Sequence, residues 1–359
     1  MTIHGGDLDV VVVNWNTGRY LADCLESVYA SAKGSEWLSR VIVVDNASTD
    51  DSLELAGPWL REPGTVLVRN AENRGFGAAC NQGAHEGTAA LLLFLNPDAR
   101  LLSGVIDRVR QFLASPAGRV VGICGVRILD DDGRPSVVGG PFPTPRLLIG
   151  HMTGLWRVAP RLFPRRHPPA PDESQFMDHV IGAFLVIRRE VFEQVGGFDE
   201  RYFMYYEEID LCLRCRELGW LTYYLADVHV FHTTNVSSDK IRAKRLFYVL
   251  RSRHQYGRRH WARRESIGMV LLSLTVELLA RMATEMSRRR RPFPGETLAG
   301  YARYGRYLLD PRRCGSDLCT QYRLEPLPLA LTWDRRTSRV NGTDHRWDTV
   351  AVARRTGPR

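Results

Sequence analysis

The chain has 359 residues, of which 44% are hydrophobic and 25% are charged, and its formal net charge is +9. This length supports one large or two moderate domains with an ample core, and no run reaches the roughly 18 uninterrupted apolar residues of a membrane-spanning helix. The N-terminus lacks a secretory leader pattern, and the seven cysteines contain one close pair, Cys212 and Cys215, which indicates core packing in a reducing cytoplasm.

Positive charge is concentrated in the C-terminal third of the chain. Residues 1–239 contain 22 Lys and Arg against 30 Asp and Glu, a net charge of −8. Residues 240–359 contain 27 against 10, a net charge of +17, and the two values sum to +9. This asymmetry predicts that the two parts contact different partners.

The first 128 residues alternate between strand-like and helix-like segments. Short runs rich in branched residues or leucine predict strands buried on both faces, over 8–13, 41–45, 66–69, 91–95 and 120–128. Helical spacing between them predicts helices over 20–32, 75–86 and 103–114, the last with Ser103 as its N-cap. Such alternation is typical of a mostly parallel sheet with helices on its faces.

The remaining segments differ in composition. Residues 130–176 contain nine prolines and predict a long loop or partly ordered lid, since a strand-like run resumes over 180–188. The sequence predicts an α/β domain over 1–239, a basic helical region over 240–309 and a poorly ordered tail over 310–359.

Polar residues follow three of the predicted strands, at the sheet edge where such folds bind ligands. Asn14 and Asn16 follow the first strand. Asp45 ends the second, where its carboxylate can accept a hydrogen bond from the N3–H of a uracil or thymine ring. Asp98, in the Asn-Pro-Asp turn 96–98, suits a divalent ion that carries a diphosphate. Ordinary turns and helix caps remain the structural alternative for each motif.

Two further features bear on ligand binding. Gly75 and Gly77 allow close backbone approach, and Arg74 can meet a phosphate, but the third glycine of a dinucleotide fingerprint is missing. His232 follows a later strand-like run and is either an ordinary structural histidine or a second metal ligand beside Asp98.

The segment 203–214 (FMYYEEIDLCLR) places Glu207, Glu208 and Asp210 in the first turn of a predicted helix. Negative charge there complements the helix dipole by about 0.3–1 kcal/mol, which is the structural interpretation. Crowded carboxylates also repel one another, which raises a pKa and can prepare one of them as a general base. The polar strand ends elsewhere in the chain favour the catalytic interpretation.

Six ordered motifs over about two thirds of the chain together resemble the family 2 inverting glycosyltransferases, and are most similar to the bacterial rhamnosyltransferases. The motifs are VVVNWNT (11–17), VIVVDNASTDDS (41–52), NRGFGAACNQG (73–83), LLFLNPDA (92–99), the segment 182–214 and the segment around His232. The resemblance implies the GT-A fold over 1–239, with a mostly parallel central sheet, followed by the basic helical extension.

The resemblance also implies a role for each matching position. Donor binding falls to Asn14, Asn16, Asp45, Asn73, Arg74, Gly75, Asn96 and Asp98, with Asp45 reading the pyrimidine base. Asp98 and His232 would bind a divalent ion, Mg²⁺ or Mn²⁺. Glu208 aligns with the catalytic base, and Glu207 is the alternative because many relatives carry the shorter Asp at this position. Asp210 either holds the helix start or contacts the acceptor.

The predicted activity is therefore transfer of a sugar, L-rhamnose from dTDP-rhamnose, to an acceptor hydroxyl. The acceptor would be a cell-envelope glycan precursor, such as a polyprenyl-linked one, or another glycoconjugate. The alternatives are a UDP-sugar donor such as UDP-galactofuranose, and a non-catalytic protein that binds nucleotide sugars.

The basic C-terminal region predicts contact with an anionic membrane surface. Residues 267–283 are apolar at helical spacing, with arginines at 263–264 and 288–291 on either side. A helix packed on the sheet domain with solvated arginines is the alternative, and no nucleic-acid motif accompanies the charge. The predicted location is the cytoplasm, with peripheral contact to the inner face of the cell membrane.

Overall fold

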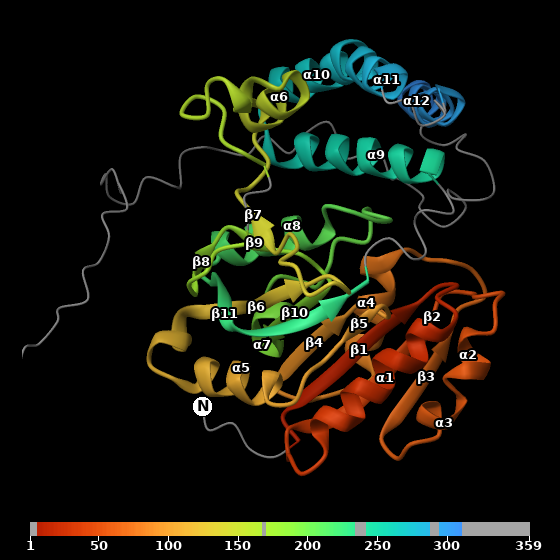
Figure 1. The fold of residues 1–359 in the computed structure, drawn as a ribbon, viewed down its shortest axis with the longest axis vertical. Helices are drawn as coiled ribbons and strands as arrows, with labels where there is room; N and C mark the ends of the chain where they lie inside the picture. The colour runs from red at the N-terminus through yellow and green to blue at the C-terminus, as the bar shows by residue number, and fades with distance from the viewer. Residues whose placement is uncertain (1–5, 167–169, 234–241, 288–293, 311–359) are drawn as a thin grey trace, which may run out of the picture. The chain divides into compact units, whose positions relative to one another are not determined.

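The structure is a computed structural model that describes residues 6–166, 170–233, 242–287 and 294–310 (Figure 1). Its main sheet has nine strands in the order β3-β2-β1-β4-β10-β6-β11-β5, with β8 pairing to β11. Six strands share one direction, whereas β5, β8 and β10 oppose them. The strands are β1 (Leu8–Asn14), β2 (Leu38–Asp45), β3 (Thr65–Arg69), β4 (Leu91–Leu95), β5 (Ala99–Arg100), β6 (Val121–Leu129), β8 (Gln175–Met177), β10 (Phe184–Arg188) and β11 (Leu221–His232). This arrangement confirms the predicted mostly parallel α/β fold.

Helices cover both faces of the sheet because its strands are apolar on both sides. In β1, Val10 and Val12 pack in one core, with α1 (Arg19–Ala32) and α5 (Val105–Ala114). Val11 and Val13 pack in the other, which is covered by α4 (Phe76–His85), α7 (Arg189–Gln194) and α8 (Glu207–Glu217). Cys212 and Cys215 are free and buried in this second core, which confirms their predicted packing role. Two short helices, α2 (Ser52–Leu55) and α3 (Gly57–Leu60), precede β3.

Three details of the predicted elements were wrong. The N-cap of α5 is Gly104, not Ser103, because the backbone there is left-handed at φ 80°. The predicted strand 180–188 is divided into β9 (His179–Val180) and β10, and the residues between them line a cavity. The proline-rich segment contains β7 (Gly139–Gly140), which pairs with β9, and the helix α6 (Pro145–Thr153).

The start of α6 shows why prolines did not prevent a helix. Pro145 occupies the first helical position, where its missing N–H leaves no hydrogen bond unmade. The Thr144 hydroxyl caps the helix by accepting a hydrogen bond from the Leu147 amide at 3.2 Å.

The C-terminal region forms α9 (Arg242–His260), α10 (Arg263–Leu272), a π-helical turn (Ser273–Glu277), α11 (Leu278–Ser287) and α12 (Pro294–Leu309). Although no spanning helix was predicted, Arg263–Thr284 is long and apolar enough to cross a membrane by length and composition. The same criterion admits core helices of soluble proteins, but only 17% of this helix's most apolar window is buried. The predicted arginine cluster 288–291 and tail 311–359 lie outside the described residues.

Helix α9 supports the loop that precedes α8. Phe203 of this loop stacks on Tyr248 with ring centroids 4.7 Å apart. The Ser252 hydroxyl donates a hydrogen bond to the Met204 carbonyl at 2.8 Å. The C-terminal helices therefore help to fix where α8 begins.

Candidate active site

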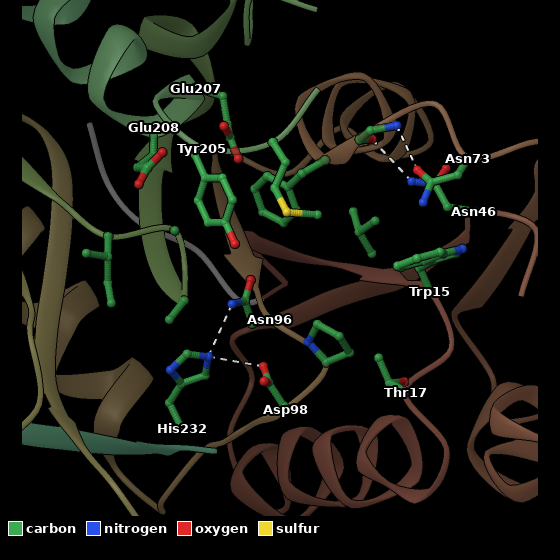
Figure 2. A pocket seen from close by; sticks show the side chains of 18 of the residues that line it. Trp15, Thr17, Asn46, Asn73, Asn96, Asp98, Tyr205, Glu207, Glu208 and His232 are labelled. Atoms are coloured by element: carbon green, nitrogen blue, oxygen red, sulfur yellow. Dashed lines mark hydrogen bonds and ion pairs between the residues drawn. The ribbon is translucent and has the colours of Figure 1, made fainter. Parts of the chain in front are cut away.

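A cavity of about 390 Å³ lies at the carboxyl ends of β1 and β4. Its walls come from these strand ends, the start of α4, residues 181–183, the start of α8, the end of β11 and one residue of α9. Figure 2 shows Glu207 and Glu208 on one side of it and Asp98 and His232 on the opposite side. The structure thus brings together seven of the twelve predicted site residues: Asn73, Gly75, Asn96, Asp98, Glu207, Glu208 and His232.

Strand pairing places Asp98 beside His232. Antiparallel β5 and β11 put Ala99 opposite His232, and the Thr233 amide donates to the Asp98 carbonyl at 3.0 Å. As a result, His232 Nε2 lies 3.1 Å from Asp98 Oδ1 and 3.2 Å from the side-chain nitrogen of Asn96. Both side chains are largely buried, with about a tenth of each exposed.

These contacts fit a divalent cation. In the tautomer with unprotonated Nε2, His232 and Asp98 would offer a nitrogen and an oxygen ligand to a divalent ion, whereas in the other tautomer Nε2–H donates a hydrogen bond to Asp98. The described part of the chain contains no cluster of three or more His, Cys, Asp or Glu side chains suited to a metal. Asp98 and His232 would therefore hold the ion with diphosphate oxygens and water, as is usual for nucleotide-bound ions. The imidazole ligand favours Mn²⁺ over Mg²⁺, which prefers oxygen.

Strained backbone positions the two glutamates. Tyr205 and Tyr206, directly before α8, have φ values of 69° and 72°. The other described non-glycine residues with positive φ are Asn16 and Ala47, in the loops after β1 and β2. Such strain costs on the order of 1–3 kcal/mol per residue and clusters at functional sites. All four positions border the ends of the sheet that carry the cavity.

Burial changes the acidity of both glutamates. It raises the pKa of Glu207 well above its usual value, and the neighbouring Glu208 carboxylate raises it further. Burial also raises the pKa of Glu208 to about 6, against the opposing effects of backbone amides at the helix start and of Arg166. One oxygen of each is buried without a hydrogen-bond partner among the described residues. Because Glu208 is ionised at neutral pH, the geometry and charge support its predicted role as base, which stays a prediction.

Asp210 has a different environment, although it lies in the same helical turn. Its side chain is fully buried and does not line the cavity. Burial alone would raise the pKa of Asp210, but His260 and Arg214, each 2.7 Å away, hold it below its usual value. A paired, inaccessible carboxylate has no surface for an acceptor, so the structure favours the first of its two predicted roles, holding the helix start.

Three predicted donor-binding residues, Asn14, Asn16 and Asp45, do not line the cavity but hydrogen-bond within the loops beside it. The Asn14 side-chain amide donates to Asp45 Oδ1 at 2.8 Å, and the Ser48 amide donates to Asp45 Oδ2 at 3.1 Å. Asn16 Oδ1 accepts from the Thr49 amide at 2.8 Å. These bonds hold the loops after β1 and β2 together. Asp45 is 4% exposed, and its reading of the base stays a prediction.

Gly75 is required by a close approach of two segments. Its φ is 86°, and a Cβ there would lie 2.5 Å from the Phe203 carbonyl oxygen. Asn73 Oδ1 accepts from the Gly75 amide at 2.9 Å and fixes this turn. Arg74 lies 4.0 Å from Glu200 and does not line the cavity, and its contact with a phosphate stays a prediction.

Twelve lining residues were not among the predicted site residues, and five of them carry a polar group or an indole ring: Trp15, Thr17, Asn46, Tyr205 and Arg245. Trp15 had a signal, since an aromatic ring at a polar strand end is suited to stack on a base. Arg245 had none, because α9 brings it to the cavity through the packing of Tyr248 on Phe203.

Comparison with known proteins identifies the family of the chain. A family model described as "Glycosyltransferase like family 2" matches residues 5–248. The N-acetylglucosaminyl-diphospho-decaprenol L-rhamnosyltransferase of Mycobacterium tuberculosis is 30% identical over 309 residues, covering 79% of this chain and 96% of that protein. The low-salt glycan biosynthesis hexosyltransferase Agl10 of Haloferax volcanii is 27% identical, covering 58% of this chain and 62% of that protein.

Solved structures include more distant matches. The mannosyltransferase PcManGT from Pyrobaculum calidifontis, in complex with GDP-Man and Mn²⁺, is 18% identical with a TM-score of 0.49, covering 86% of this chain and 82% of that one. The family model covers more than half of the chain, and the mycobacterial relative is matched over nearly its whole length. The chain therefore belongs to glycosyltransferase family 2.

Proposed function

We propose that this glycosyltransferase moves L-rhamnose from dTDP-rhamnose to a hydroxyl group of a lipid-linked glycan precursor. The observation that carries the proposal is that Glu208, Asp98 and His232 line one cavity at the carboxyl ends of the strands. The name of the mycobacterial relative, which specifies L-rhamnose and an N-acetylglucosaminyl-diphospho-decaprenol, supports the choice of sugar and acceptor.

In this reaction the Glu208 carboxylate removes a proton from the acceptor hydroxyl as the hydroxyl oxygen attacks the anomeric carbon. The new carbon–oxygen bond forms as the bond to the nucleoside diphosphate breaks, so the configuration at that carbon inverts. The nucleoside diphosphate leaves with the electron pair, and the proton stays on Glu208. General-base assistance of this kind contributes about 10²- to 10⁴-fold in rate.

Other residues of the wall position the two substrates. Trp15 is partly buried and can stack on the base of the donor. Asp98 and His232 would hold a divalent ion, which neutralises charge on the leaving diphosphate when bound. Arg245 reaches the cavity from α9 and adds positive charge near the same group.

The test is turnover of the full-length protein with Mn²⁺ and a synthetic polyprenyl-diphospho-N-acetylglucosamine acceptor. dTDP-rhamnose is compared with UDP-galactofuranose and UDP-glucose, and the product is identified by mass spectrometry. We expect a rhamnosyl product and thermal stabilisation by dTDP that depends on Mn²⁺. The Asp98→Asn variant should keep the fold and lose at least the 10- to 100-fold in metal affinity that even outer-shell changes cost.

Two results would change the conclusion. Preferential turnover of a UDP-sugar would keep the enzyme class and exclude rhamnose as the donor sugar. No stabilisation by any nucleotide, with or without Mn²⁺, would exclude a nucleotide-sugar donor altogether.

A further inference from the structure

The long helix formed by α10, the π-helical turn and α11 buries polar side chains and exposes aliphatic ones. Besides Met269, its buried residues are Ser266, Ser273 and Glu277, each at most 6% exposed. Its exposed residues include Leu271 and Leu279, which are 60% and 69% exposed, and also Ile267 and Val276. A helix surrounded by water normally buries its apolar stripe and exposes its polar one.

This orientation is fixed by a satisfied polar contact. Arg253 of α9 donates to Glu277 at 2.6 Å and to the Ser273 hydroxyl at 2.8 Å. Arg281 adds a second ion pair to Glu277 at 2.9 Å. Turning the helix to bury its leucines would break these bonds and leave the buried Arg253 without its partner, so the exposed leucines belong to a specified arrangement.

A neighbouring segment has the same surface character. Helix α6 packs on α10 through Leu147, Leu148 and Met269, and Figure 1 shows α6 and α10 next to each other. The residues that follow α6 expose Val158 at 79% and Leu162 at 57%.

Basic and aromatic side chains accompany this exposed apolar surface. The Trp156 ring lies 5.2 Å and 5.3 Å from the guanidinium groups of Arg157 and Arg165. Residues 144–166 contain five arginines and no Asp or Glu, and Arg263 and Arg264 are exposed where α10 begins. Interfacial segments of membrane-bound proteins combine arginine, tryptophan and exposed aliphatic side chains in this way.

We propose that this lipid-facing surface, formed by the outer side of α10–α11 and by residues 155–165, docks on an anionic lipid bilayer. The helix lies in the membrane interface and does not cross it, because α6, α9 and α12 contact its other side along both halves. The aliphatic side chains enter the acyl boundary, and the arginines bind lipid phosphates. This surface complements the proposed lipid-linked acceptor, but it does not depend on which sugar is transferred.

The experiment measures binding of the full-length protein to vesicles of phosphatidylcholine alone and of phosphatidylcholine with an equal part of phosphatidylglycerol. The test variant is Leu271→Gln with Leu279→Gln. The matched control is Leu55→Gln with Leu218→Gln, two leucines that are 44% and 47% exposed on α2 and just after α8. We expect wild type and control to bind the anionic vesicles, and the test variant to bind at least about tenfold more weakly, or about 1.4 kcal/mol.

Three outcomes would overturn the proposal: no binding of the wild type to either vesicle, equal binding by the test variant, or a soluble dimer that the test variant dissociates in light scattering. The last would assign the surface to a second copy of the chain. Stabilisation by dTDP and Mn²⁺ is measured on the same samples and should be unchanged in both variants. Failure of membrane docking is therefore distinguishable from failure of the proposed transfer.

Discussion

Helices α8 and α10–α11 both bury glutamates, but the pKa values of these glutamates are shifted in opposite directions. In α8, burial raises the pKa of Glu207 and Glu208, and each has an oxygen without a hydrogen-bond partner in the described part of the chain. Burial would also raise the pKa of Glu277, but Arg253 and Arg281 hold it below its usual value. Burying a carboxylate with incomplete hydrogen bonding is costly and leaves a raised pKa that suits proton transfer, whereas the ion-paired Glu277 makes a structural contact.

The same contrast exists within one turn of α8. Asp210 is three residues beyond Glu207, yet its carboxylate is paired with Arg214 and His260 and has no access to the cavity. Asp210, which faces α9 and the next turn of α8, is paired with basic side chains, whereas Glu207 and Glu208, which line the cavity, have no such ion pair among the described residues. Helix α9 contributes to both clusters through Arg253 and His260, and so links the C-terminal helices to the start of α8.

The strongest test of this contrast is Glu208→Gln. The variant keeps the shape of the side chain but cannot accept a proton, so we expect kcat to fall by about 10²- to 10⁴-fold. Donor affinity, measured by calorimetry, should be nearly unchanged. The control is Glu217→Gln, an exposed position at the end of the same helix. If turnover survives in Glu208→Gln and is lost in Glu207→Gln, the base is Glu207.

A second test is Glu277→Gln, which removes the charge from the paired cluster. Breaking a buried ion pair from one side leaves Arg253 buried and uncompensated, which typically costs about 3–5 kcal/mol. We expect the unfolding midpoint in urea to fall accordingly, whereas Glu217→Gln should change stability by less than about 0.5 kcal/mol. An unchanged midpoint would mean that the pair does not fix the orientation of α10–α11.

Local sequence patterns predicted most of the sheet. They did not predict which carboxylates in the first turn of α8 line the cavity and which one is ion-paired. The strand predicted over 91–95 has the same first and last residues as β4, because a leucine-rich run buried on both faces has a clear pattern. Glu207, Glu208 and Asp210 had to be treated as one cluster, because their difference depends on Arg214 and on His260, 50 residues later in the chain.

The same limit applies to the cavity wall and to the C-terminal helix. Asp98 and His232 could be proposed as a pair only by resemblance, since the pairing of β5 with β11 that joins them is non-local. The apolar character of residues 267–283 was visible in the sequence. That its apolar side faces outward was not, because the orientation depends on the contact of Glu277 with Arg253 from another helix.

The pH dependence of turnover provides a third, smaller test. Because Glu208 must be ionised to act as base and its pKa is raised to about 6, we expect kcat to fall as the pH drops through about 6, approaching tenfold per unit. Arg166 lowers this pKa, so Arg166→Gln should move the inflection of the profile to higher pH. A profile that is flat down to the ordinary pKa of glutamate would contradict the buried, unpaired state of Glu208.

The smallest effect is expected for the stability of Glu207→Gln. The sign of this change distinguishes a buried glutamate with a raised pKa from an ion-paired one such as Glu277. The folded-state pKa of Glu207 is raised by burial and by Glu208, so the wild type loses stability as the pH rises from the unfolded pKa through the folded one. Glutamine cannot ionise, so the variant should be more stable than the wild type in mildly alkaline buffer, measured as a higher unfolding midpoint in urea. In acid, where the wild-type carboxyl group is also neutral, the gain should vanish. Destabilisation in the mildly alkaline buffer, as expected for Glu277→Gln, would show that the Glu207 carboxylate has a partner in solution, as Glu277 does.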